Sequence, residues 1–547
     1  MSKPSSVSKV LSDSRTRNLL LVLTLLLSAG LRLWALDAHC LWNDEVATWV
    51  HASAGGVAEV LSSVLRKELP APPLHFLLTH FVLLLGDTDF TLRFPSVALG
   101  VLAVAATYSL GTQLFGREIG LSAALLLAIS PFHIRYSQEA RAYAQLTLLS
   151  VLSLYCLWRS ISDSRPRWWF GFVTFATLSL YTHLFALLFL LAEIMFGVGL
   201  GLWAASRPEE LPEARRKAAS FATSLLAIAT LYAPLVPFLL QAMGRQAGLA
   251  SVGKGMPITS AFVVSMLGSF GSGPGLDLMA FLMLFLFGII ASVRLHRRQL
   301  WLTFCWTVVP FLALWVMQAK HGVHPRYMIF ILPVYLVLVS RGLTALGSAA
   351  SARLPRGWQH GRSFAFALLI SVLAAMSLGR AWSYYAEDRA DWRAAAIFLG
   401  TTIAPGEEIA SPGALAGVLL PRYDERLEDV KFSGGGSEVF LDSTLRQTAG
   451  VWFVARSGRN MEIVEQALKT GSFSVFKVVF PVDRRSAETA IALDVGPMFY
   501  DLSVLYVRDG LEHEELEARY LQALSLVPPR AAASIDSALG ELQREER

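Results

Sequence analysis

Long apolar runs separated by short polar segments fill the first 383 residues of the chain. About eleven of these runs are close to the ~20 residues that a helix needs to cross a bilayer. They cover residues 19–36, 92–115, 118–134, 140–158, 168–184, 186–204, 218–240, 276–293, 300–318, 327–346 and 363–383. We therefore predict an α-helical polytopic membrane domain over residues 1–383.

A shorter apolar run, residues 74–85, decides the expected topology. If it crossed the membrane, the sidedness of every later span would be inverted. The run is short for a span and follows Pro72 and Pro73, as an interfacial helix can. With residues 37–91 as one outer loop, the inner loops hold Arg117, Arg159, Arg165, Arg167, Arg207, Arg215, Arg216, Lys217, Arg294, Arg297, Arg298, Arg353, Arg356 and Arg362. This arrangement satisfies the positive-inside rule.

After Trp382 charged residues become frequent and the apolar runs shorten to strand length. The pattern predicts a small soluble α/β domain over residues 384–547, on the same outer side as the first loop. We expect strands at 451–455, 473–480 and 504–507, helices at 391–399 and 461–470, and a helical tail from Glu512.

Composition supports a membrane class and excludes others. The 547 residues are 54% hydrophobic and 16% charged, more apolar than a soluble core needs. The net charge of +5 could suggest nucleic acid, but Lys and Arg lie in short clusters between apolar runs, so no nucleic-acid partner is expected. Cys40, Cys156 and Cys305 offer neither a disulfide framework nor a metal-thiolate spacing.

Several polar residues break the positive-inside pattern because they lie in the outer loop or at outer helix ends. They are Arg66, Lys67, Arg93, Arg135, Gln138, Glu139, Arg141, Tyr143, Lys254, Lys320, His321, His324, Arg326 and Tyr327. For any one of them, ion pairing or snorkelling at a helix end is the simpler interpretation. As a set they favour an outer cavity that binds an anion, and phosphate suits Arg and Lys best.

Asp44 and Glu45 place adjacent carboxylates just after the first span. From these residues alone a helix start is the simpler interpretation, since Asn43 and Asp44 are preferred N-cap residues and Glu suits a first turn. In a cationic outer cavity, however, a carboxylate is also the group that takes a proton from an acceptor hydroxyl.

Residues 130–143 join two spans at the outer face. If the segment is helical, Gln138 and Arg141 share one face, and Glu139 lies on another, where it can simply pair with an Arg. His183, next to Tyr181 and Thr182, is more typical of a hydrogen-bonded residue at a helix end.

Taken together, these motifs resemble the GT-C membrane glycosyltransferases. The resemblance rests on Asp44-Glu45, Pro72-Pro73-Leu74-His75, Arg93, Ser137 to Tyr143, Arg326-Tyr327 with Pro333, and Asp391-Trp392-Arg393. Within this family, the motifs most resemble the bacterial branch that is related to dolichyl-phosphate-mannose protein mannosyltransferases and lipid A aminoarabinose transferases. It covers residues 19 to about 400.

The resemblance implies transfer of a sugar from a polyprenyl-phosphate donor to a lipid, glycan or protein acceptor at the outer face of the inner (plasma) membrane. Asp44 falls at the catalytic position and Glu45 at the second acidic position, while Arg141 and Arg326 fall near the donor phosphate. His75 stands where the aminoarabinose branch has a Lys. No metal site is assigned, and a divalent metal cofactor stays open.

Two other classes remain open from the sequence. A transporter or flippase of lipid-linked sugars would also need many spans and outer positive charges, but its usual inverted repeats and charged mid-membrane helices are not evident. An assembly protein whose soluble domain binds a partner is the third interpretation. Because Asp44 is the one strong base candidate, a single displacement with inversion is expected of a transferase.

Overall fold

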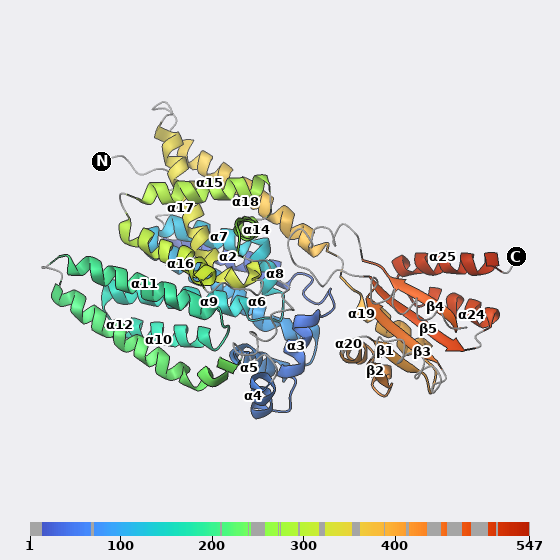
Figure 1. Ribbon diagram of the computed structural model, residues 1–547. Coiled ribbons are helices and arrows are strands. Elements are labelled where there is room, and N and C mark those ends of the chain that lie inside the picture. The colour runs from blue at the N-terminus through green and yellow to red at the C-terminus, as the bar shows by residue number, and fades with distance from the viewer. Residues whose placement is uncertain are drawn as a thin grey trace. The chain divides into compact units, whose positions relative to one another are not determined.

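The computed structural model divides the chain into two compact units, drawn in Figure 1. One comprises residues 1–36 and 48–385, and the other residues 37–47 and 386–547. The structure describes residues 14–66, 71–207, 211–238, 240–241, 258–271, 273, 275–293, 296–316, 323–352, 361–387, 389–411, 415–434, 450–456, 473–482, 501–509 and 512–545.

The first unit is helical, and its long helices match the predicted spans. Among the described residues, eight helices are long and apolar enough to cross a membrane, and a bent pair raises the number to nine. The eight are α2 (Ser14–Leu33), α6 (Asp89–Phe115), α9 (Tyr143–Asp163), α11 (Ala186–Ala205), α12 (Leu211–Tyr232, continuing through η2, Ala233–Leu235), α16 (Arg297–Val316), η3 with α17 (Pro325–Ile331, Leu332–Ala352) and α18 (Gly361–Tyr385). The chain is thus a multi-pass membrane protein.

The other predicted spans are helical but differ in length or shape. The run at 118–134 is bent by 61° between α7 (Arg117–Ala128) and α8 (Pro131–Ser137). Pro131 has no N–H with which to continue α7, and the Ser130 hydroxyl accepts a hydrogen bond from His133 N to begin α8. The shorter helices α10 (Pro166–Leu180) and α15 (Leu276–Ser292) occupy the runs at 168–184 and 276–293, and α14 (Ser260–Phe270) precedes α15.

The described residues of loop 37–91, which the sequence predicts to be the outer loop, form three short helices, α3 (Asn43–Ala52), α4 (Val57–Leu65) and α5 (Leu74–Leu83). The last begins directly after Pro73, as the sequence predicts. Leu74 N donates a hydrogen bond of 2.9 Å to Tyr181 O, which fixes the start of α5 beside the junction of α10 and α11.

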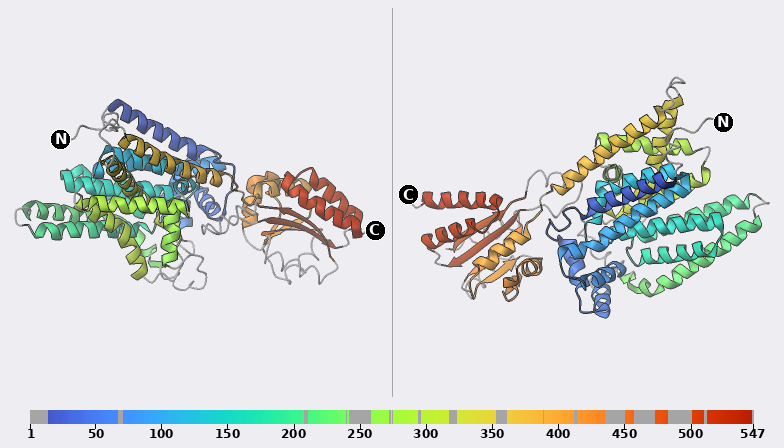
Figure 2. Two further views of the ribbon diagram at one scale, coloured as in Figure 1. Left: turned by 90° about the horizontal axis from the view of Figure 1, so that it is seen from above. Right: turned by 180° about the vertical axis from the view of Figure 1, so that it is seen from behind.

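The helices of this unit pack closely. Figure 2 shows α9, α10, α11 and α12 as neighbouring rods, and these helices contact one another. The helices α15 and α17 approach through Gly288 and Gly342, where a Cβ on either glycine would overlap a carbonyl oxygen of the facing helix. Small residues allow such contact between membrane helices.

The second unit contains a five-stranded mixed sheet in the order β2-β1-β3-β5-β4. Strand β1 (Glu408–Ser411) pairs in parallel with β2 (Phe432–Gly434) and with the central strand β3 (Val451–Arg456). Strand β5 (Leu502–Asp509) is antiparallel to β3 and to β4 (Phe473–Phe480). Its helices are α19 (Trp392–Thr402), α20 (Leu415–Tyr423), η4 (Glu425–Leu427), α24 (His513–Leu524) and α25 (Pro529–Glu545).

The strands and helices predicted for this part of the chain are confirmed where the structure describes them. The three predicted strands, the helix after Asp391 and the helical tail are present. The helix predicted at 461–470 lies outside the described residues. The elements β1, β2 and α20 were not predicted. Strands of three or four residues, such as β1 and β2, carry too little alternation to be recognised.

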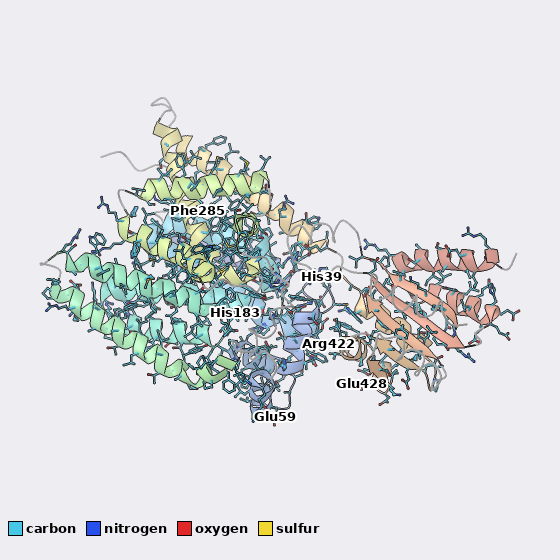
Figure 3. The ribbon with its side chains drawn as sticks, viewed as in Figure 1. His39, Glu59, His183, Phe285, Arg422 and Glu428 are labelled. Carbon is cyan, nitrogen blue, oxygen red and sulfur yellow. The ribbon has the colours of Figure 1, made fainter. Side chains whose placement is uncertain are left out.

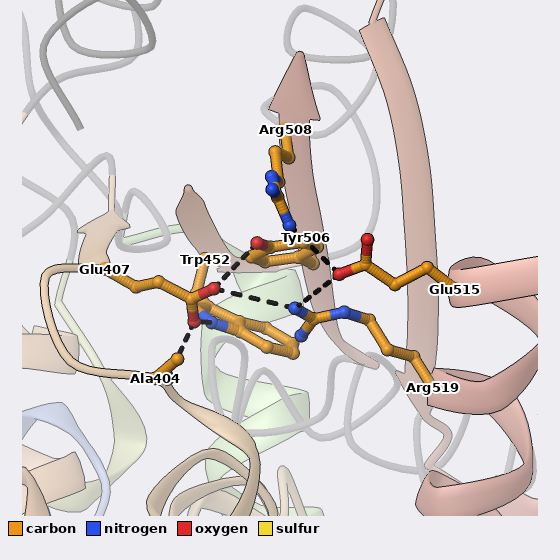
Figure 4. A network of polar contacts seen from close by, with 7 residues as sticks. All are labelled: Ala404, Glu407, Trp452, Tyr506, Arg508, Glu515 and Arg519. Atoms are coloured by element: carbon orange, nitrogen blue, oxygen red, sulfur yellow. Dashed lines mark hydrogen bonds and ion pairs between the residues drawn. The ribbon is translucent and has the colours of Figure 1, made fainter. Parts of the chain in front are cut away.

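A buried polar network joins α24 to the sheet (Figure 4). The Glu407 carboxylate accepts hydrogen bonds from Tyr506 Oη at 2.7 Å and Trp452 Nε1 at 2.8 Å. The Arg519 guanidinium lies 3.7 Å from Glu407 Oε1 and 4.1 Å from the centre of the Tyr506 ring. Burial, followed by the bond to Glu407, raises the pKa of Tyr506 to about 12. The network fixes the helix on one face of the sheet.

Candidate functional site

The candidate site begins where α5 meets the start of α9. His75, in the first turn of α5, is 2% exposed, and its Nδ1 lies 3.3 Å from Gln145 Oε1 on α9. The ring also hydrogen bonds to the main chain of Ala140. The outer-loop helix is therefore held against the segment that joins α8 and α9.

This joining segment is not helical, which corrects the helical-face grouping expected for residues 130–143. The first helix ends at Ser137 and α9 begins at Tyr143, with a turn closed by Arg141 N donating to Glu139 O at 2.7 Å. Pro131 begins a new short helix, and the turn that follows aims residues 138–142 in directions that a continuous helix would not give.

Arg141 lies half-buried in this turn and is held from two sides. Its Nη1 donates to Thr48 Oγ1 on α3 at 3.4 Å, and its carbonyl accepts from Ser96 Oγ on α6 at 3.2 Å. Thr48 is fully buried and lies one helical turn after Asp44 on α3. Glu139, two residues earlier, is 1% exposed.

Aromatic rings from separate segments gather beside Arg141. The Tyr143 ring lies 5.1 Å from Tyr136, 5.8 Å from His183 and 6.3 Å from Tyr327, centre to centre. Tyr327 also contacts Phe185 at 5.0 Å and His324 at 5.5 Å. Figure 3 marks His183, which lies at the junction of α10 and α11.

Arg326 supplies the second cation of this aromatic cluster. It lies in η3, is 8% exposed, hydrogen bonds to the Tyr136 hydroxyl and has its guanidinium 5.5 Å from the centre of the Tyr327 ring. A short 3₁₀ turn that opens on Pro325 and leads into α17 positions this side chain.

Both cations act on His183, and Arg141 alone acts on His75. Burial, and then the charges of Arg141 and Arg326, lower the pKa of His183 to about 3. Burial, and then the charge of Arg141, lower the pKa of His75 to about 4. Both imidazoles are therefore neutral near pH 7, so the positive charge of the site comes from the two arginines.

The predicted site residues thus fall into two groups. His75, Arg141, Tyr143, His183, His324, Arg326 and Tyr327 come together, with Glu139 buried beside them. Arg93 and Gln138 instead bind main-chain carbonyls: Arg93 Nη1 donates to Leu36 O at 2.8 Å, and Gln138 Nε2 donates to Arg32 O at 3.0 Å and Trp34 O at 2.7 Å. They fix the end of α2, from which the outer loop starts. Lys320 lies outside the described residues.

Asp44 and Glu45 lie in the first turn of α3, so the helix-start interpretation holds for their position. Glu45 is fully buried, and its carboxylate lies 3.5 Å from Trp42 N. In the part of the chain that the structure describes, no group of three or more His, Cys, Asp and Glu is placed to hold a metal ion.

Two buried ionisable residues within predicted spans were missed. Arg32, fully buried in α2, donates to Ala128 O at 2.9 Å and lies 2.6 Å from His133 Nδ1, which joins α2 to α7 and α8. Glu193, fully buried in α11, accepts from Ser153 Oγ on α9 at 2.8 Å. A charged residue inside an apolar run is the signal that identifies both, and Glu193 corrects the expectation that charged mid-membrane positions are not evident.

Comparison with known proteins places this architecture. Residues 70–212 match the family model of dolichyl-phosphate-mannose-protein mannosyltransferase. ArnT from Cupriavidus metallidurans, solved bound to undecaprenyl phosphate, is similar with 13% identity and a TM-score of 0.57, covering 88% of this chain and 97% of that one. Its apo structure is also 13% identical, covers the same shares of each chain and gives a TM-score of 0.54. The chain has the GT-C fold.

Similarity within the GT-C fold extends to a more distant protein. The apo oligosaccharyltransferase of Archaeoglobus fulgidus is 12% identical with a TM-score of 0.50, covering 81% of this chain and 70% of that one. No curated protein sequence matches. The resemblance to GT-C enzymes inferred from the motifs is confirmed. Of the cluster, His75, Arg141, Tyr143 and His183 lie within the matched segment 70–212.

Proposed function

We propose that this GT-C protein is a glycosyltransferase that moves a sugar from a polyprenyl-phosphate donor to a hydroxyl or phosphate of a glycolipid, cell-envelope glycan or protein. The observation that carries the proposal is the convergence of Arg141 and Arg326 on His183 within a largely buried aromatic cluster. Buried cations of this kind suit a bound phosphate. ArnT, which shares the fold, was solved with undecaprenyl phosphate.

In the proposed reaction the bond between the sugar's anomeric carbon and the phosphate oxygen breaks, and the electron pair leaves with the phosphate. Arg141 and Arg326 stabilise the charge that develops on this leaving group. Such preorganised donors are worth most where water is excluded. Neutral His183 accepts a hydrogen bond from Phe185 N at its Nδ1, so its single N–H, on Nε2, can be donated to the same phosphate. The single N–H of neutral His75 is instead directed at Gln145 and Ala140.

Asp44 is the proposed base that takes the proton of the acceptor hydroxyl while its oxygen attacks the anomeric carbon. Thr48, which accepts a hydrogen bond from Arg141, lies four residues after Asp44 on α3. Residues four apart share one face of a helix, which supports assigning Asp44 and the cations to one reaction. Glu45 points about 100° away and supports rather than shares this role.

A single displacement by the acceptor inverts the anomeric configuration. Retention would require a carboxylate nucleophile and a separate acid or base at the same carbon. Nucleotide sugars are cytoplasmic, so a site on the outer face requires a donor that lipid can carry. We therefore place the reaction at the outer face of the inner (plasma) membrane, with the C-terminal domain on that side.

The test is sugar transfer by the purified protein in liposomes that contain a radiolabelled polyprenyl-phosphate sugar and acceptor membranes. Arg141→Ala and Arg326→Ala should each lower kcat/KM for the donor about tenfold or more, because each removes a charge-assisted partner of the phosphate. Arg117→Ala is the control, since Arg117 is an exposed arginine that belongs neither to the cluster nor to the predicted set of outer cations.

Two outcomes contradict the proposal. Full activity of both variants at limiting donor would remove the phosphate assignment. Movement of intact donor between the leaflets, with no sugar transferred to any acceptor, would favour a flippase instead.

A further inference from the structure

A cavity lies at the end of α9 opposite the aromatic cluster. It has a volume of about 410 Å³ and is lined by the last turns of α9 and α11 and the first turns of α10, α12 and α16. The helix α9 starts at Tyr143 in the cluster and reaches the cavity at Ile161. At 1.5 Å per residue, these positions are separated by about 27 Å, so the cavity is distinct from the candidate site.

The walls of the cavity are apolar, and the cavity opens on the side of the helix bundle that would face lipid. Ile161, Trp169, Leu200 and Phe221 line it. Gly201 also lines it, and a Cβ added there would meet no atom within 4 Å. Val198, a further lining residue, is 47% exposed, so the cavity opens on the apolar face of α11.

Basic side chains surround the polar end of this cavity. Lys217 and Arg298 line it, and Lys217 Nζ pairs with Glu213 at 2.7 Å. The guanidiniums of Arg298 and Arg207 lie 5.3 Å and 4.8 Å from the centre of the Trp203 ring. Positive charges outnumber the single carboxylate, and the tryptophan with its arginines is typical of the membrane interface.

An apolar cavity that opens toward lipid and ends in basic side chains fits an amphiphile with an anionic head. Basic pockets between membrane helices bind anionic lipid head groups, and free phosphate would gain nothing from the apolar walls. We propose that this cavity binds an anionic phospholipid, with an acyl chain along Phe221 and Leu200 and the phosphate beside Lys217 and Arg298. The proposal is independent of the proposed transferase activity.

Native mass spectrometry of the full-length protein in mixed micelles tests this site, with phosphatidylglycerol and phosphatidylcholine as probes. The wild-type protein should retain phosphatidylglycerol in preference to phosphatidylcholine. Lys217→Gln and Arg298→Gln should each weaken retention about fivefold, because each removes one basic contact. Arg117→Gln is the control, an exposed arginine of an inner loop outside the cavity.

Filling the cavity tests the acyl-chain contact separately. Gly201→Leu should abolish selective retention of phosphatidylglycerol, whereas Gly379→Leu should not, although both glycines have open space around a Cβ. If Gly201→Leu fails to fold, the charge variants decide. Equal retention of both lipids, or unchanged retention in both charge variants, would overturn the proposal. Displacement of phosphatidylglycerol by polyprenyl phosphate would assign the cavity to the carrier lipid and also overturn it.

Discussion

His75 illustrates how burial sets the chemistry of single residues in this protein. Its ring is enclosed by α5 and α9, and the charge of Arg141 adds to the cost of protonation. The single N–H of the neutral ring is directed at Gln145 and Ala140, so the positive charge offered to a phosphate would come from the arginines. This division of roles distinguishes the site from one in which a lysine holds the phosphate.

The lowered pKa of His75 predicts a pH dependence of stability. The unfolded ring takes a proton near pH 6.5 and the folded ring near pH 4, so the unfolded state binds more protons between these values. Stability should fall as pH falls through this window, by up to about 1.4 kcal/mol per pH unit. In thermal unfolding in detergent from pH 7 to 4.5, His75→Gln should show a shallower loss than wild type. Parallel curves would contradict this reading of the ring.

At this scale the residues of the cluster could be selected from the sequence more readily than their positions could be predicted. Tyr143, Arg326 and Tyr327 could be selected because polar residues at the outer ends of spans need a reason. Gln138 belongs to the same set by sequence, yet its amide binds the carbonyls at the end of α2. The Gln138 and Arg141 side chains point in different directions because the chain turns after Ser137. Such a turn has no reliable sequence signature.

Among the elements, the contact between α15 and α17 depends most on residue size. Gly288 faces Leu338 O and Gly342 faces Leu284 O, so neither position has room for a Cβ. Because η3 leads directly into α17, this contact also supports the segment that carries Arg326.

Gly342→Leu should therefore separate the two helices. The expected cost is about 1–3 kcal/mol from overpacking, seen as a lower thermal midpoint in detergent. Gly379→Leu on α18 is the matched control, since a Cβ there meets nothing within 4 Å. If the two variants unfold at the same temperature, the close packing of α15 on α17 is not what stabilises this unit.

The presence of helices could be predicted from apolar runs of about 20 residues, because the backbone N–H and C=O groups of a segment in lipid must hydrogen bond within that segment. Helix bounds could not always be read, as α10 shows. Its predicted run continues to residue 184, but the helix ends at Leu180, and apolar residues continue through the non-helical turn from Tyr181 to Phe185. Hydropathy does not distinguish these two conformations.

At the scale of the whole molecule, sidedness is the feature that links the helices to the proposed chemistry. The long outer loop and the C-terminal domain must both lie outside if the donor is a lipid-linked sugar. The proposed sidedness rests on the unequal distribution of Lys and Arg between the loops on the two sides of the membrane.

Single cysteines at Glu428 and Arg297 in a cysteine-free background test this topology, since both positions are exposed. An impermeant thiol reagent applied to intact cells should label position 428 and leave 297 unlabelled until the membrane is opened. A permeant reagent should label both, which controls for reactivity. Labelling of 297 but not 428 would invert the topology.

The most direct measurement of the central claim is the product formed by wild-type protein and by Asp44→Asn from a polyprenyl-phosphate sugar of known anomeric configuration. The amide keeps the shape of the carboxylate but cannot take a proton. We expect wild-type protein to give a product with inverted configuration by NMR, and Asp44→Asn to bind the donor without transferring sugar. Substantial transfer by Asp44→Asn, or retention of the donor's configuration, would contradict the account.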